Sequence, residues 1–243
     1  MVINKKPKEK KKNYFMTTDE AMILWRYSAL WGSKWQVLIG LCMFRGLRIG
    51  EAVAVNIKDF SDDKFDKLRV ILQKSYVVDE FPIIKGFDAV LKNYIKDNVH
   101  LLKDGWLFPS HSSQSKTQHM TVDTAITKLY KMRLVIGRKH PEFLDKIIFP
   151  HSKSNNSSSG NYERFRISFH SLRRWFETNI WDKYKDKMML RDVMRYSHSK
   201  TVDVYINPYE VWKKERTLLN DCFSDLFKDF EFSIKGQTKL SMF

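Results

Sequence analysis

The sequence has little cysteine and no long apolar run. Of its 243 residues only two are cysteines, Cys42 and Cys222, and no C-x-x-C spacing occurs. Both stand among apolar residues, which favours buried thiols in a reducing compartment over a disulfide framework. No stretch of about 18 apolar residues is present, so we expect no membrane span. The N-terminal charges have no apolar stretch behind them, and we therefore expect no signal peptide.

The sequence also lacks the ligand spacing of a zinc site, because its histidines are scattered. Charge of one sign is in excess instead: 43 Lys and Arg residues against 28 Asp and Glu residues give a net charge of +15. This exceeds what solubility needs and indicates a polyanionic partner, such as nucleic acid or an anionic membrane surface. The length and the 43% hydrophobic content are sufficient for one sizeable core.

Apolar periodicity predicts a mainly helical chain with one small antiparallel sheet. Thr17-Thr18-Asp19-Glu20 is a capping box that opens a helix through Leu30, and Gly46 ends the second helix. Two β-rich runs around a polar turn, 68–73 and 80–84, predict a hairpin. The expected helices are 17–30, 34–44, 49–55, 87–99, 122–136, 168–182, 187–195 and 208–227.

Composition divides the chain into one domain with two tails. Residues 1–16 are predicted to be a basic flexible tail, and residues 231–243 a C-terminal tail. Between them, 17–230 is expected to form one domain. Within it, a run rich in serine and asparagine predicts a mobile insertion at about 151–162.

Two basic motifs are candidates for a phosphate-binding site. Arg48 opens a helix among apolar residues, where a guanidinium suits a phosphate oxygen, although it could instead pair with Glu51 one turn later. Both arrangements are compatible, because an acidic partner would orient the guanidinium. His170 and Arg173 are three residues apart and share one helix face. They form either a solvated basic patch or half of a phosphate site.

Four elements in order resemble the catalytic domain of the tyrosine recombinases, the phage integrase family, over about residues 17–220. Gly46–Glu51 matches the family's G-L-R-x-x-E, and His170–Arg173 matches its H-x-L-R. Lys74 falls on the predicted hairpin, eight residues before Pro82. Tyr205 follows a threonine-containing turn. The resemblance implies the tyrosine recombinase catalytic-domain fold (α+β), mainly helical with a small antiparallel sheet.

The resemblance also implies a function for each of these residues. The enzyme would cleave and rejoin DNA at specific sites through a covalent 3′-phosphotyrosine, with no cofactor, metal or ATP. Tyr205 would be the nucleophile, favoured over Tyr209. The remaining roles are phosphate neutralisation by Arg48 and Arg173, protonation of the leaving oxygen by Lys74, and acceptance of the tyrosine proton by His170.

The last family position departs from the pattern. Nine residues before Tyr205, where the family has a histidine or tryptophan that contacts the phosphate, stands Tyr196. Either Tyr196 fills this role or His198 does, and we favour His198 because Ser197-His198-Ser199 is similar to the family's G-H-S. Arg174 and Lys200 are candidate DNA contacts.

Several properties of the whole protein follow from the resemblance as expectations. The partner is expected to be double-stranded DNA, with self-association as a tetramer on it and no membrane attachment. The protein would be cytoplasmic in a prokaryotic host, or nuclear in a eukaryotic one, and encoded by a virus or mobile element. Members of the family usually carry a DNA-clamping domain before the catalytic domain. In this sequence only about sixteen residues precede the capping box. Without such a domain, DNA binding should be weaker and more salt-sensitive.

Two alternative functions stay open on the sequence. One is a DNA breaking-rejoining activity like that of type IB topoisomerases or telomere resolvases. The other is a catalytically silent DNA-binding relative.

Overall fold

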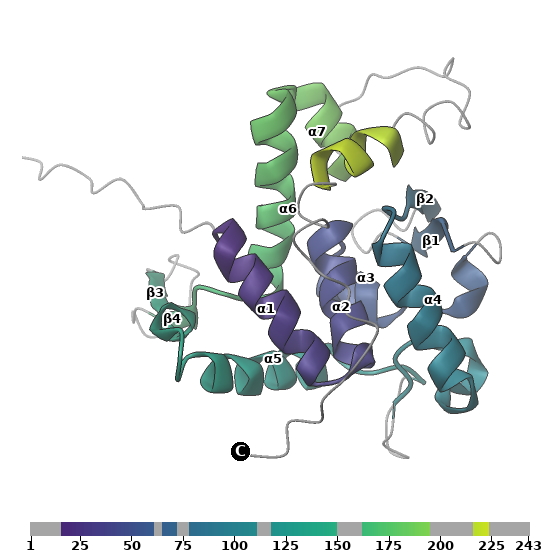
Figure 1. The fold of residues 1–243 in the computed structure, drawn as a ribbon, viewed down its shortest axis with the longest axis horizontal. Coiled ribbons are helices and arrows are strands. Elements are labelled where there is room, and N and C mark those ends of the chain that lie inside the picture. Colours follow the sequence, from purple (N-terminus) through teal and green to yellow (C-terminus); the bar gives the residue numbers. More distant parts are fainter. Residues whose placement is uncertain are drawn as a thin grey trace, which may run out of the picture.

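Helices predominate in the computed structural model, which describes residues 16–60, 65–71, 78–110, 118–149, 162–194 and 216–223 (Figure 1). The α-helices are α1 Thr18–Leu30, α2 Ser33–Phe44, α3 Ile49–Val53, α4 Phe87–Asn98, α5 Val122–Ile136, α6 Phe169–Tyr184 and α7 Lys187–Met194. Residues 216–223 are also helical. Short 3-10 turns are η1 Ile57–Asp59, η2 Val99–Leu101, η3 Lys103–Gly105 and η4 Pro141–Leu144. Among the described helices, none is both long and apolar enough to cross a membrane.

The observed helices confirm the expected ones to within about two residues at each end, where both ends are described. The helix expected at 208–227 is confirmed over 216–223, and its remainder lies outside the described residues. The expected tails and insertion also lie outside them, with two exceptions. Met16 is buried in the core, and Tyr162 begins a strand.

Helix α2 is the centre of the fold. Its residues from Val37 to Phe44 are all buried, and it packs against α1, α4 and α6. A helix that is apolar all round has to be covered on every side, and these three neighbours provide the cover. The ring of Phe44 lies at their junction, with its centroid 4.8 Å from Trp25, 5.7 Å from Phe87 and 6.4 Å from Trp175. These contacts join α1, α4 and α6 in one aromatic core.

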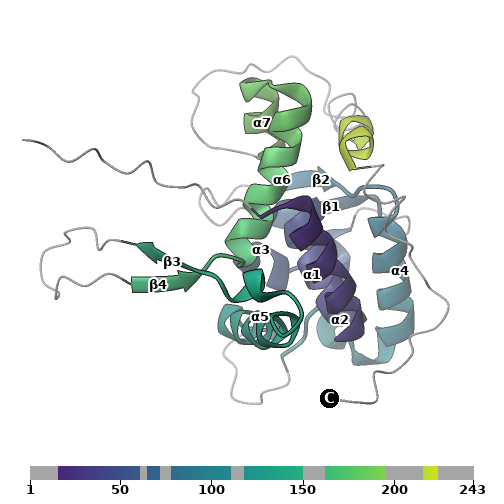
Figure 2. The same cartoon turned by 60° about the vertical axis from the view of Figure 1, so that its left-hand side comes forward.

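Two antiparallel hairpins flank this core. Strands β1 Lys67–Ile71 and β2 Val78–Pro82 confirm the predicted hairpin, with Leu68 opposite Phe81. Strands β3 Lys146–Phe149 and β4 Tyr162–Phe165 form a second hairpin, which projects from the helical body beside α5 (Figure 2). The expectation of a single sheet was wrong in this respect.

A buried ion pair ties the start of α1 to the segment before α6. The predicted capping box is present, with Thr17 N–H donating to Glu20 Oε2 at 2.8 Å. Arg166 also donates to both carboxylate oxygens of Glu20, and each of these two side chains is 8% exposed. Burial alone would raise the pKa of Glu20, but the hydrogen bonds from Arg166 and Thr17 outweigh it and hold the pKa below its ordinary value.

We predict that Arg166→Met lowers the free energy of unfolding by about 3–5 kcal/mol, because it leaves the Glu20 carboxylate buried without its cation. Urea denaturation measures the change. The matched control is Arg69→Met, since Arg69 and Glu80 form an exposed pair at 3.0 Å. This control should cost no more than about 1 kcal/mol. Equal losses for the two variants would contradict the account.

Candidate functional site

The turn after α2 is shaped by Gly46. The helix ends at Phe44, and Gly46 then adopts a φ of +67°, a conformation that favours glycine. A Cβ atom on Gly46 would lie 2.6 Å from the ring of Phe176 on α6, so the close approach also requires glycine. The prediction that Gly46 ends this helix is confirmed. Arg48, the N-cap residue of α3, follows directly after this turn.

Arg48 is oriented by a buried carboxylate. Its Nη1 atom lies 2.9 Å from Glu51 Oε1, and its backbone N–H donates to Glu51 Oε2 at 2.8 Å. The Glu51 side chain is 1% exposed, whereas that of Arg48 is 24% exposed. The acid therefore fixes the guanidinium while part of it stays accessible from solvent. The predicted pairing of Arg48 with Glu51 is confirmed.

Arg173 reaches the same turn from α6. Its Nη1 donates to the carbonyl of Gly46, and its Nη2 donates to the carbonyl of Met194, the last residue of α7, at 3.3 Å. Its Nε lies 3.4 Å from Glu177 Oε1, and the residue is 6% exposed. Arg173 is thus held by the turn after α2, by its own helix and by the end of α7.

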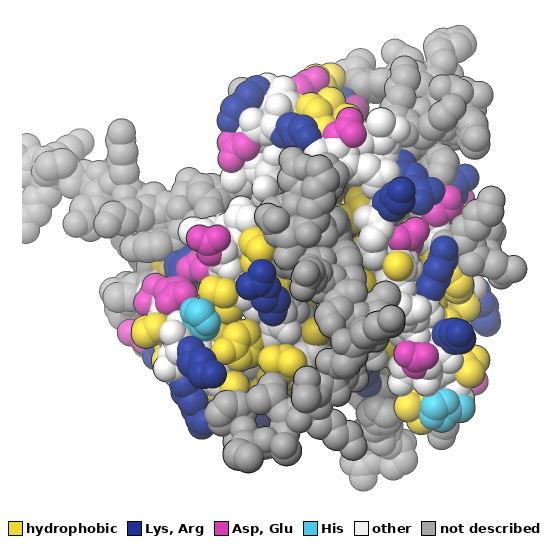
Figure 3. All heavy atoms as spheres, viewed as in Figure 1, with side chains coloured by type: hydrophobic (Ala, Val, Ile, Leu, Met, Phe, Trp, Pro, Cys, Tyr) yellow, Lys and Arg dark blue, Asp and Glu magenta, His cyan; other side chains and the backbone are white. Residues whose placement is uncertain are grey.

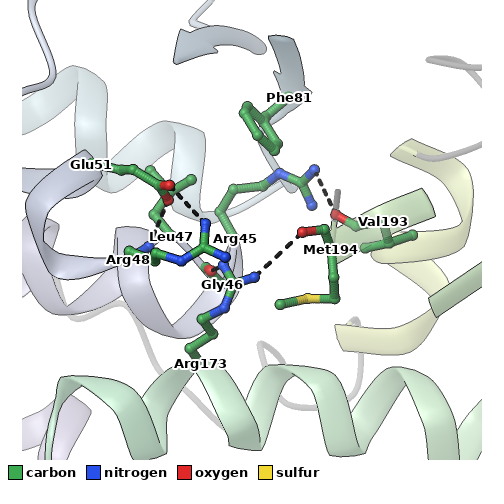
Figure 4. A pocket seen from close by; sticks show the side chains of 9 residues that line it. All are labelled: Arg45, Gly46, Leu47, Arg48, Glu51, Phe81, Arg173, Val193 and Met194. Atoms are coloured by element: carbon green, nitrogen blue, oxygen red, sulfur yellow. Dashed lines mark hydrogen bonds and ion pairs between the residues drawn. The ribbon is translucent and has the colours of Figure 1, made fainter. Parts of the chain in front are cut away.

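Arg48 and Arg173 line one pocket (Figure 4). The pocket is small, and part of the space between its lining atoms opens to solvent. The lining residues are Arg45, Gly46, Leu47, Arg48, Glu51, Phe81, Arg173, Val193 and Met194. Two guanidinium groups that are far apart in the sequence therefore meet, which suits an anion with several oxygens.

Positive charge is more concentrated at this pocket than on the face shown in Figure 3. On that face the Lys and Arg side chains of the described residues are scattered among acidic and apolar ones. Arg45, Phe81, Val193 and Met194 are the pocket residues that the sequence analysis missed. The signal available for Arg45 was its place directly before Gly46, within an apolar run.

His170 lies one turn before Arg173 on α6 and is exposed, as is Arg174. Neighbouring protein atoms still remove part of its hydration, and this desolvation is the largest influence that lowers the pKa of His170. The positive charges of Arg174, Arg173 and Arg48 act in the same direction, while Glu177 opposes them. The imidazole is therefore electrostatically coupled to two of the pocket arginines, Arg48 and Arg173.

The other predicted site residues lie outside the described residues. Lys74 belongs to 72–77, between β1 and β2, whereas Tyr196, His198, Lys200 and Tyr205 belong to 195–215, after α7. Their assignments stay predictions.

The phage integrase family model matches residues 14–210 of this chain. Three solved structures are similar to it. XerA recombinase matches with a TM-score of 0.55 and 12% identity over 89% of this chain and 65% of that one. The integrase from mycobacterium phage Brujita matches with a TM-score of 0.52 and 14% identity, over 88% and 59% of the two chains. XerH recombinase, bound to its difH substrate in a pre-cleavage complex, matches with a TM-score of 0.50 and 18% identity, over 76% and 47%.

The chain thus spans less than two thirds of each of these recombinases. No curated protein matches its sequence. At these identities the likeness shows a shared fold, which is that of the tyrosine recombinase catalytic domain, as expected from the sequence.

We predict that His170 titrates below the ordinary histidine pKa of about 6.5. Arg174→Gln should raise this pKa, because removal of a nearby positive charge favours the imidazolium. Glu177→Gln should lower it further, because it removes the opposing negative charge. NMR titration of the imidazole measures each value, with His170→Gln to assign the signal. Arg138→Gln, an exposed arginine that does not act on His170, is the control. Shifts of the opposite sign would refute this electrostatic description.

Proposed function

The chain belongs to the phage integrase family, and we propose that it is a site-specific DNA recombinase that cleaves and rejoins strands through a tyrosine. The observation that carries this proposal is the meeting of Arg48 and Arg173 in one pocket. One follows the turn after α2 and the other comes from α6, so the fold itself brings the two motifs together.

The proposed reaction is a transesterification at a DNA phosphate. The Tyr205 hydroxyl oxygen attacks phosphorus, and the bond from phosphorus to the 5′-oxygen breaks. The products are a 3′-phosphotyrosine and a free 5′-hydroxyl, and rejoining is the reverse attack. One phosphate ester replaces another, so the reaction needs neither ATP nor a metal to supply energy.

The two arginines would stabilise the charge that builds on the non-bridging oxygens during attack. Arg48 suits this role because Glu51 fixes its guanidinium at a pocket wall that opens to solvent. Arg173 suits it because backbone carbonyls on two other elements hold its side chain. Groups that are already oriented need no reorganisation when the charge develops, which is why such donors are effective.

Proton transfer would involve His170 and Lys74. A tyrosine hydroxyl has a pKa of about 10 and attacks poorly unless a base accepts its proton. The lowered pKa of His170 keeps the imidazole neutral near pH 7, the form that can accept a proton. Lys74 would donate a proton to the leaving 5′-oxygen. His198, or else Tyr196, would donate a hydrogen bond to the phosphate.

The proposed partner is double-stranded DNA, which the net charge of +15 favours. The similar XerH was solved bound to its DNA substrate. Exchange between two duplexes cuts four strands, and each chain supplies one tyrosine nucleophile. We therefore propose a tetramer on DNA as the active assembly, with Arg174 and Lys200 as backbone contacts.

The test is a nicked suicide duplex made from the DNA that flanks the protein's own gene. Loss of the short fragment beside the nick prevents rejoining, so a covalent adduct accumulates and migrates slowly on a denaturing gel. Wild type should form the adduct, Tyr205→Phe should form none, and Tyr209→Phe should form it normally. An adduct that survives Tyr205→Phe, or no adduct from wild type, would refute the proposal.

A further inference from the structure

A third arginine, Arg45, lies behind the two proposed phosphate-binding arginines. It is the C-cap residue of α2 and is 2% exposed. Its guanidinium carbon lies 4.4 Å from the ring centroid of Phe81 and 5.9 Å from that of Phe176. Its Nη2 donates to the carbonyl of Val193 at 3.4 Å. Figure 4 shows the side chain between β2 and the end of α7.

Burial of an arginine is costly unless its surroundings replace the lost hydration. The planar guanidinium suits this site, because one group can stack on aromatic rings and also donate in its own plane. Arg45 does both, and its contacts are on three different elements: β2, α6 and α7. A side chain in such a place determines how these elements lie relative to one another.

The end of α7 is held by two arginines together. The last carbonyls of a helix have no partner within the helix and are stabilised by nearby cations. Arg45 contacts the carbonyl of Val193, and Arg173 contacts that of Met194. The final turn of α7 is thereby fixed against the same pocket that contains Arg48.

The elements that Arg45 holds are connected in sequence to the other proposed catalytic groups. Lys74 lies in the segment that precedes β2, and Tyr205 and His198 lie in the segment that follows α7. We infer that Arg45 is a positioning residue, which sets where β2 and the end of α7 stand relative to Arg48 and Arg173. It acts through these elements rather than on the DNA. This inference rests on the proposed function.

The experiment compares Arg45→Met with Arg45→Lys in single-turnover cleavage of the suicide duplex. Methionine fills similar space without charge or donors, whereas lysine keeps the charge but not the planar group. We expect the rate constant for adduct formation to fall at least tenfold for Arg45→Met and less for Arg45→Lys. The amplitude and the Kd for DNA should stay within threefold of wild type. Rate and amplitude separate the two possible roles, because partial misfolding lowers the competent fraction rather than the rate constant.

Two further variants keep the test decisive if Arg45→Met does not fold. Phe81→Leu removes the stacking ring on β2 and should lower the rate constant in the same direction. Tyr94→Phe is the matched control, because it removes a buried hydrogen bond to the Leu107 carbonyl away from the pocket. Its rate constant should equal that of wild type.

A rate constant for Arg45→Met within twofold of wild type would overturn the inference. So would a fall in amplitude alone, which would make Arg45 a purely structural residue. If Arg45→Met does not fold, wild-type rate constants for Arg45→Lys and Phe81→Leu would overturn it too. In each of these cases the wild-type adduct leaves the proposed function intact. Absence of any adduct from wild type is a different result, which refutes the proposed function and this inference with it.

Discussion

The hydrogen bond from Arg173 to the Gly46 carbonyl joins two segments that are 127 residues apart, and the site depends on it. The carbonyl belongs to a turn whose positive φ requires glycine, and Phe176 occupies the space that a Cβ atom would need. Helix α6 can therefore pack this closely only against a turn that has glycine at this position. Since Arg48 follows two residues after Gly46, this turn sets where Arg48 stands relative to Arg173.

The electrostatics of the pocket follow from this arrangement. Three arginines line it, while Glu51 pairs with Arg48 and Glu177 with Arg173. Positive groups that are held close together repel one another, and a bound phosphate would relieve this repulsion with charge-assisted hydrogen bonds. Desolvation is the largest cause of the lowered pKa of His170, and Arg173 and Arg48 contribute to it in the same direction. The cluster that would bind an anion thus also adds to the effects of desolvation and Arg174, which favour the neutral imidazole that a base requires.

The structural features that depend on residues close together in the sequence were predicted correctly. The box from Thr17 to Glu20 and the pairing of Arg48 with Glu51 each join residues three positions apart, and both are present. The second hairpin could not be predicted in this way, because strands of four residues carry little periodicity. Arg45 was missed for a different reason. A lone arginine is usually exposed, and its burial depends on rings from β2 and α6 that only the tertiary structure brings together.

The most direct test of the central claim, that Arg48 and Arg173 act on one phosphate, is a double-mutant cycle on the single-turnover cleavage rate. Each of Arg48→Gln and Arg173→Gln should lower the rate by on the order of 10²–10³, the usual effect of losing one oriented donor. The double variant should lose far less than the product of the two effects, because residues that act as a unit are not additive. Losses that multiply would show that the two arginines work independently and would contradict the account.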